Sequence, residues 1–96
     1  MSSITQPSLP PAGAWCVYLL RCRDDSLYAG ATNHLERRVA LHGSGKGARY
    51  TRSRRPVRLV YFERAADRSA ALKRERAIKR LDRARKLALI GQRKRS

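Results

Sequence analysis

The fold of this chain is decided by the stretch WCVYLLRCRDDSLYAGA, residues 15–31. Its first six residues are aromatic, aliphatic or β-branched, a composition that favours a buried strand. Residues 23–26 are polar, and Asp and Ser side chains can bond the local backbone of a turn. Residues 27–31 resume as a short strand, so the stretch predicts a hairpin.

Further elements follow from the apolar spacing and from capping residues. The order β-β-α-β-α-α predicts an α+β domain, with a small three-stranded antiparallel or mixed sheet flanked by helices. Beyond the hairpin we expect a helix capped by Thr32 or Asn33 and ending at Gly43, a glycine-rich loop at 43–47, a basic segment at 49–55, a strand at 57–62, a long helix capped by Asp67, and a final short helix capped by Asp82 and ended by Gly91.

The length of 96 residues allows one domain with one modest core. We expect a flexible tail at 1–13, the folded domain at 14–91 and a basic tail at 92–96. Cys16 and Cys22 would lie about 20 Å apart on one strand, too far for a disulfide or for a zinc site with His34 and His42. Both cysteines are therefore expected to be reduced.

The charge of the chain points to a polyanionic partner. Its 23 Lys and Arg against 7 Asp and Glu give a net charge of +16, and nucleic acid phosphates neutralise such charge. A ribosomal or architectural role competes with an enzymatic one on charge alone. A membrane surface is disfavoured because no basic amphipathic helix carries a Trp- or Phe-rich face. No signal peptide or transmembrane run is recognisable, which predicts a cytoplasmic protein.

Glu75 is the one acidic residue without an obvious surface or capping role. Helical spacing puts it between Leu72 and Ile78 on the apolar side of its helix. A carboxylate there needs a cationic partner or a metal. Two interpretations stay open: an ion pair with one of the many arginines, and a ligand for Mg²⁺, which one or two carboxylates hold together with water and phosphate.

Other chemistry-bearing side chains share this placement on apolar faces. Arg38 is expected to face inward, with His42 four residues later on the same line. Tyr18 and Tyr28 lie on the two hairpin strands, where a tyrosine is ordinarily a core residue. Near a metal and arginines, however, the phenolate of such a tyrosine is favoured, and it could take a proton from water. Together these residues suggest a phosphodiester site.

The tripeptides Cys16-Val17-Tyr18 and Tyr28-Ala29-Gly30 resemble the pair that names the GIY-YIG nucleases. Arg38, His42 and Glu75 follow in that family's order. The resemblance spans residues 15–90. Segments 47–51 and 54–56 look like the small stand-alone bacterial branch and like the catalytic subunit of the eukaryotic structure-specific endonuclease. The first tripeptide is CVY rather than GIY, and the asparagine that several branches carry late in the domain has no counterpart.

The resemblance implies a role for each matching residue. Tyr18 would be the general base or position the water, Tyr28 would support that water, and Gly30 would keep the site open to the substrate backbone. Arg38 would stabilise charge on the phosphate, and His42 would assist in proton transfer or orientation. Glu75 would hold a single Mg²⁺ or Mn²⁺ ion.

These roles predict a metal-dependent endonuclease that hydrolyses phosphodiester bonds in DNA and selects DNA structures of the repair or recombination type. A nucleic-acid-binding module on the same fold, with weak or no cleavage, is the alternative, and an RNA-associated basic protein is a third. A protein partner could supply substrate specificity. Residues expected to contact nucleic acid are Gly30, Lys46, Arg49, Tyr50, Arg52, Arg54 and Arg55.

Overall fold

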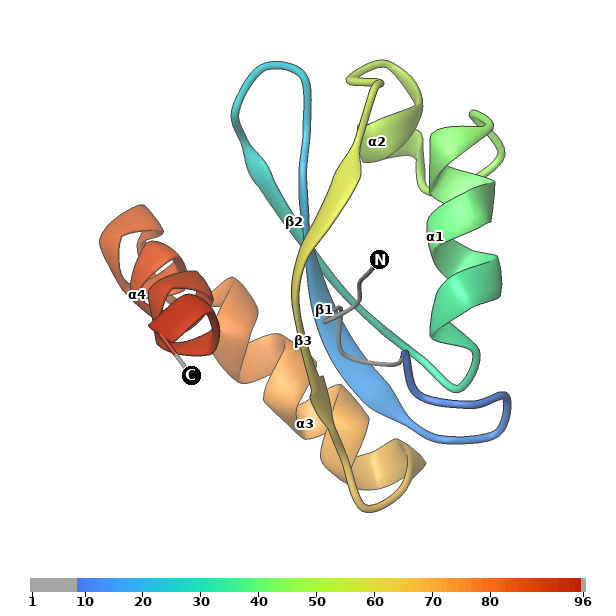
Figure 1. Ribbon diagram of the computed structural model, residues 1–96, viewed down its shortest axis with the longest axis vertical. Coiled ribbons are helices and arrows are strands. Elements are labelled where there is room, and N and C mark those ends of the chain that lie inside the picture. The colour runs from blue at the N-terminus through green and yellow to red at the C-terminus, as the bar shows by residue number, and fades with distance from the viewer. Residues whose placement is uncertain (1–8, 96) are drawn as a thin grey trace, which may run out of the picture.

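The computed structural model describes residues 9–95 and, within them, the side chains of residues 9–91. A three-stranded sheet occupies the middle of the molecule, and helices lie on both sides of it (Figure 1). The elements in chain order are β1 (Cys16–Arg21), β2 (Leu27–Thr32), α1 (Leu35–Gly43), α2 (Arg49–Arg52), β3 (Arg58–Arg64), α3 (Arg68–Lys79) and α4 (Arg83–Arg95).

The sheet has the order β2-β1-β3, and both pairings are antiparallel. The predicted α+β class and three-stranded sheet are therefore confirmed. The central strand β1 is buried along Cys16 to Leu20, which explains why its sequence is an unbroken apolar run rather than an alternation. An irregularity between Leu19 and Leu20 interrupts its pairing with β3.

Successive side chains of β1 point to opposite faces of the sheet and enter two separate clusters. Val17 and Leu19 pack with Ala71 and Ile78 on the side of α3 and α4. On the other side, Tyr18 belongs to a cluster that also contains Cys16, Leu20, Leu35 and Phe62. Figure 1 shows α1 and α2 on this second side. A hydroxyl in mid-strand is therefore held between the sheet and α1.

Three local expectations need correction. The N-cap of α1 is His34, whose side chain accepts a hydrogen bond from the Arg37 amide, while Thr32 accepts one from the His34 amide. The basic segment contains the short helix α2, an element that the predicted order lacks. Gly91 does not end the last helix, because α4 continues to Arg95; a lone helical glycine costs only about 1 kcal/mol relative to alanine.

The chain ends differ from the expected tails where they are described. Pro10 is buried, and the Gly13 amide donates to the Asn33 carbonyl, so these two residues contact the domain. Residues 1–8 and 96 of the expected tails lie outside the described part of the chain. Cys16 and Cys22 are both buried and free, as expected. Between residues 9 and 95, none of the helices is long and apolar enough to cross a bilayer.

Candidate active site

A buried row of three polar side chains lies between the sheet and α1. The Tyr18 hydroxyl is 3.0 Å from Nε2 of His42, and Nδ1 of the same ring is 2.7 Å from Oγ1 of Thr51. The exposed fractions are 2 % for Tyr18, 1 % for His42 and 0 % for Thr51. The row joins β1, α1 and α2, so the unexpected helix α2 contributes one end of it.

Two glycines provide the space that this row occupies. A Cβ atom on Gly30, which pairs with Tyr18 across the hairpin, would lie 2.5 Å from Cζ of the Tyr18 ring. A Cβ on Gly47 would lie 2.7 Å from Cγ of His42. Gly30 therefore makes room for Tyr18 itself, whereas we expected it to make room for the substrate backbone. The family resemblance includes segment 47–51, but nothing in its sequence indicated that Gly47 and Thr51 contact His42.

Tyr28 continues the site toward the surface through ring contacts. Its ring centroid is 5.2 Å from that of His42 and 5.9 Å from that of Tyr50, which stacks on it at 27°. The Arg54 guanidinium covers the Tyr50 ring, with Cζ 3.8 Å from the ring centroid. Tyr50 is thus engaged in packing, and a nucleic acid base would have to displace these neighbours in order to stack on it.

Arg38 differs from the inward-facing residue that the helical spacing predicted, because its side chain is exposed on α1. Leu35, one turn earlier on that helix, takes the buried position instead. The positive charge of Arg38 nevertheless acts on both buried groups: together with burial it lowers the pKa of His42, and it offsets part of the rise that burial causes in the pKa of Tyr18. Because Arg38 is exposed and acts electrostatically on Tyr18 and His42, it is suitably placed to hold an anionic group over these two side chains.

Glu75 lies on the largely buried side of α3, as its spacing predicted, with 19 % of its side chain exposed. Its ion-pair partner is the lysine one turn later, with Lys79 Nζ 3.2 Å from the carboxylate, where we expected an arginine. Although α3 packs on the opposite face of the sheet, against β1 and β2, the negative charge of Glu75 contributes to raising the pKa of Tyr18.

The proton affinities of the buried row differ from our expectation. Burial, followed by the neighbouring Tyr28, raises the pKa of Tyr18 well above its ordinary value, whereas we expected a favoured phenolate. That expectation concerns a site that holds a metal; in the protein alone, burial in a low-dielectric interior disfavours a charged oxygen more than Arg38 favours it. Burial and the charge of Arg38 lower the pKa of His42. Both groups are therefore neutral near pH 7.

Glu75 is the residue that could hold a metal here. Between residues 9 and 91, no three His, Cys, Asp or Glu side chains gather into a site. Mg²⁺ does not need such a cage, because it keeps several waters and takes one or two carboxylates together with phosphate oxygens. A largely buried carboxylate whose ion-pair partner is a half-exposed lysine fits that requirement, since the ammonium can move away.

The basic residues expected to bind nucleic acid fall into two groups. Arg54 is held in place: its Nε is 3.0 Å from the Asp24 carboxylate, and its guanidinium donates to the Tyr50 carbonyl. Arg55 donates at longer range to the carbonyls of Arg52 and Gly43. The side chains of a second group are exposed and make no hydrogen bond or ion pair within residues 9–91: Lys46, Arg49 and Arg52. This second group remains available for phosphates.

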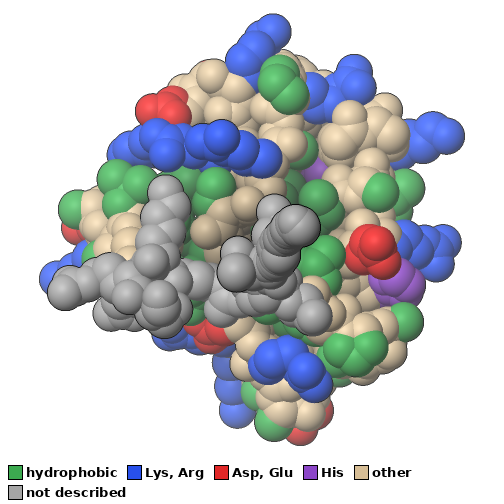
Figure 2. Space-filling view, viewed as in Figure 1, with side chains coloured by type: hydrophobic (Ala, Val, Ile, Leu, Met, Phe, Trp, Pro, Cys, Tyr) green, Lys and Arg blue, Asp and Glu red, His purple; other side chains and the backbone are tan. Residues whose placement is uncertain are grey.

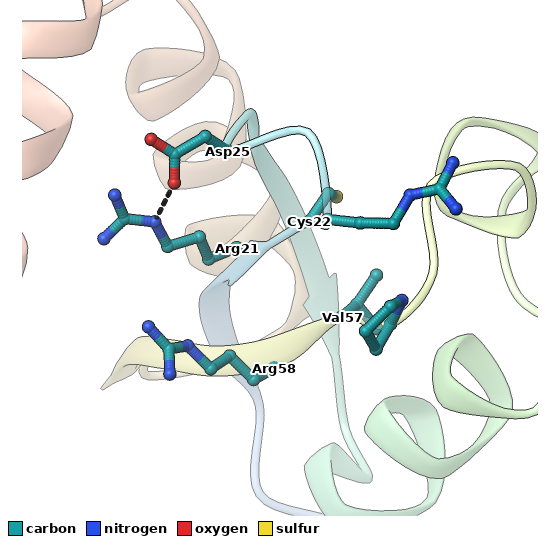
Figure 3. A pocket seen from close by; sticks show the side chains of 7 residues that line it. Arg21, Cys22, Asp25, Val57 and Arg58 are labelled. Carbon is teal, nitrogen blue, oxygen red and sulfur yellow. Dashed lines mark hydrogen bonds and ion pairs between the residues drawn. The ribbon is translucent and has the colours of Figure 1, made fainter.

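Basic side chains project from several sides of the face drawn in Figure 2, with only scattered acidic ones among them. A shallow cavity of about 220 Å³ beside Arg38 is also lined by Asn33, His34 and Arg37. A second one, of about 340 Å³, lies at the end of the sheet (Figure 3) and is lined by Arg21, Cys22, Arg23, Asp25, Pro56, Val57 and Arg58. No predicted site residue lines this second cavity, so it is separate from the buried row.

Comparisons with known proteins agree with this architecture. The family described as the GIY-YIG catalytic domain matches residues 14–88. The UPF0213 protein DP2720 of Desulfotalea psychrophila is 56 % identical over 78 residues, covering 80 % of this chain and 71 % of that protein. The solution NMR structure of the UPF0213 protein BH0048 from Bacillus halodurans has a TM-score of 0.54 at 40 % identity, over 82 % of this chain and 84 % of that one.

A second solution NMR structure, of the protein EF2693 from E. faecalis, has a TM-score of 0.58 at 38 % identity and covers 86 % of this chain and 88 % of that one. The paired tyrosine tripeptides, the sheet order and these matches over nearly the whole described chain lead to one conclusion: the protein belongs to the GIY-YIG catalytic domain family and is similar to small bacterial members of it.

Proposed function

We propose that this protein is a metal-dependent endonuclease that hydrolyses phosphodiester bonds in DNA and selects structured DNA of the repair or recombination type. The observation that carries the proposal is the buried row of Tyr18, His42 and Thr51, on which the charges of Arg38 and Glu75 both act. A protein that only binds phosphates needs exposed cations, and it does not need a buried tyrosine hydroxyl that is hydrogen-bonded to a histidine ring.

Each site residue has a role in the reaction that agrees with its position in the structure. Arg38, exposed at the mouth of the site, holds the phosphate and stabilises the charge that develops on its oxygens. Tyr18 takes a proton from the attacking water, and His42 is the base that accepts a proton from Tyr18. Tyr28 packs against His42 and limits the space in which the water can sit.

Glu75 would hold the single Mg²⁺ or Mn²⁺ ion, after exchanging its contact with Lys79 for the metal. A bound divalent ion supplies positive charge that polarises the phosphate and stabilises the leaving oxygen. A cation beside Glu75 would also offset the negative charge that contributes to raising the pKa of Tyr18.

Cleavage of a panel of labelled nucleic acids tests the proposal. Single-stranded, duplex, flap and four-way-junction DNA, with RNA of the same sequences, are incubated with Mg²⁺, Mn²⁺ or EDTA. Glu75→Gln and Tyr18→Phe should abolish cutting, whereas Glu36→Gln, which removes an exposed acid on α1, should leave it intact. Tight binding without cutting, unchanged by Glu75→Gln, would instead make the protein a binding module.

Metal binding can be measured without a substrate. Mn²⁺ titration of the free protein, followed by electron paramagnetic resonance, should show one site that Glu75→Gln removes. Lys79→Ala should tighten that site, because it removes the cation 3.2 Å from the carboxylate without changing the ligand. Equal Mn²⁺ affinity in wild type and Glu75→Gln would contradict the placement of the ion.

A further inference from the structure

Thr51 lies at the inner end of the buried row, and its single hydroxyl hydrogen determines how the whole row is hydrogen-bonded. Its Oγ1 donates to the Ala48 carbonyl at 3.0 Å. With that hydrogen used, Oγ1 can offer only a lone pair to His42 Nδ1, which is 2.7 Å away. With Thr51 bonded in this way, the proton in the short contact belongs to Nδ1 of His42.

This assignment fixes the other side of the ring. A neutral imidazole with its hydrogen on Nδ1 carries a lone pair on Nε2. The Tyr18 hydroxyl, 3.0 Å from Nε2, is then the donor, and both lone pairs of its oxygen are turned away from His42. A water molecule beside Tyr18 would meet an oxygen that can accept its proton.

One contact favours the opposite tautomer and has to be weighed against this one. The Ala48 amide points at His42 Nδ1 from 3.4 Å, and it would need a lone pair there. A contact of 3.4 Å is at the outer limit of hydrogen bonding, whereas 2.7 Å is well inside it. The opposite tautomer would also turn the Thr51 hydroxyl away from the Ala48 carbonyl, which would keep the Arg52 amide, 3.0 Å away, as a donor but lose this second hydrogen bond.

We propose that Thr51 is a positioning residue, which holds His42 in the Nδ1–H tautomer so that Nε2 can receive the Tyr18 proton during phosphodiester hydrolysis. The proposal rests on the role assigned above to Tyr18. In the step, water gives one proton to the Tyr18 oxygen while the hydroxyl proton of Tyr18 passes to His42 Nε2. The resulting hydroxide forms the new P–O bond, and the bond to the leaving oxygen breaks.

The cycle closes without a net change in the protein. The leaving oxygen takes a proton from solvent, and His42 returns its extra proton through Tyr18 after the product departs. This relay never produces a free phenolate, which agrees with the raised pKa of Tyr18. A phosphate held by Arg38 would also offset the charge of Arg38 that lowers the pKa of His42.

Nitrogen-15 NMR of the imidazole rings tests the tautomer directly in the free protein at pH 7.5, because protonated and unprotonated ring nitrogens resonate far apart. The chain has only two histidines. His34 accepts the Arg37 amide through Nδ1, so it should show the opposite tautomer, and His34→Asn removes its signals while keeping a capping residue. The wild-type His42 ring should be protonated at Nδ1.

Thr51→Val and Thr51→Ser form the matched pair of variants. Valine keeps the shape of threonine but leaves His42 only the Ala48 amide, so the ring should shift toward Nε2–H and cleavage should fall about 100-fold, the lower range for loss of general base assistance. Serine restores the hydroxyl, and it should recover both the wild-type spectrum and activity. Unchanged amide spectra away from the site would show that both variants fold.

Two results would overturn the inference: His42 protonated at Nε2 in wild type, or the Nδ1–H tautomer retained in Thr51→Val. These readings do not depend on catalysis. Failure of the wild type to cut any substrate would count against the proposed function, and the NMR measurement would still decide whether Thr51 sets the tautomer. Loss of activity in Thr51→Ser despite a wild-type spectrum would also contradict the positioning role.

Discussion

Replacement of Gly30 by alanine should destabilise the protein through its contact with Tyr18. The new methyl group would lie 2.5 Å from Cζ and 2.9 Å from Cε2 of the Tyr18 ring, far inside van der Waals contact. The ring has little room to move away because Tyr18 is 2 % exposed and packs in the cluster of Leu20 and Leu35.

The expected cost follows from two contributions. Overpacking a filled interior costs about 1–3 kcal/mol, and displacing the Tyr18 hydroxyl from His42 removes a buried hydrogen bond worth about 1 kcal/mol. Gly30→Ala should therefore lower the free energy of unfolding by about 2–4 kcal/mol. For a domain of this size, that corresponds to a fall in Tm of about 8–32 °C.

Urea unfolding followed by circular dichroism measures this loss, and Gly43→Ala is the matched control because a methyl group there meets nothing within 4 Å. The control should change stability by less than about 1 kcal/mol. A double-mutant cycle locates the contact: in a Tyr18→Ala background, Gly30→Ala should become nearly neutral. A cost below about 0.5 kcal/mol for Gly30→Ala alone, or an equal cost in both backgrounds, would refute the reasoning.

Three further predictions follow from the same contacts. Because the pKa of His42 is lowered in the folded state, the unfolded chain binds more protons. The free energy of unfolding should therefore fall as the pH drops below about 6.5, by up to about 1.4 kcal/mol per pH unit. Urea unfolding from pH 7.5 to 5.5 should show this dependence on pH, and His42→Gln should flatten it. Arg74 joins α3 to β3 through both oxygens of the Glu63 carboxylate. Arg74→Met should lower the free energy of unfolding by about 1 kcal/mol, as expected for a partly exposed ion pair. Arg76→Met on the same helix should change it by less than about 0.5 kcal/mol. Arg52→Ala should reduce the slope of log affinity for DNA against log salt by about 1 and leave stability unchanged. Arg54→Ala should also destabilise the free protein, by about 0.5–1 kcal/mol from its contact with the Tyr50 ring alone. Equal unfolding midpoints for these two variants would contradict the distinction.

The hairpin and its family resemblance could be predicted from sequence because they depend on local patterns. A continuous apolar run, a polar turn and a second short strand predict β1 and β2 in any surroundings. The caps Asp67 and Asp82 act within three residues of themselves, and both accept the amide hydrogen bond expected of them. Helical spacing also placed Glu75 correctly on the buried side of α3, since that spacing depends only on the helix.

The errors concern how a helix or loop meets its neighbours. Spacing put Arg38 on the same face as Leu35, but α1 turns that leucine toward the sheet and leaves Arg38 exposed. The proton affinity of Tyr18 depends on how deeply α1 and α2 bury it, and a sequence does not give burial depth. The partner of Glu75 is Lys79 on its own helix, a pairing that composition alone could not separate from the many arginines.

The sequence by itself determined the charge of the protein, its α+β class and the identities of its chemistry-bearing side chains. Only the tertiary structure decided that Thr51, to which the sequence assigned no role of its own, ends a buried hydrogen-bonded row, and that Gly30 and Gly47 make room for Tyr18 and His42. The physical reason is that periodicity and capping act over a few residues. A hydrogen bond between side chains 24 positions apart, such as Tyr18 to His42, exists only once packing has brought β1 and α1 together.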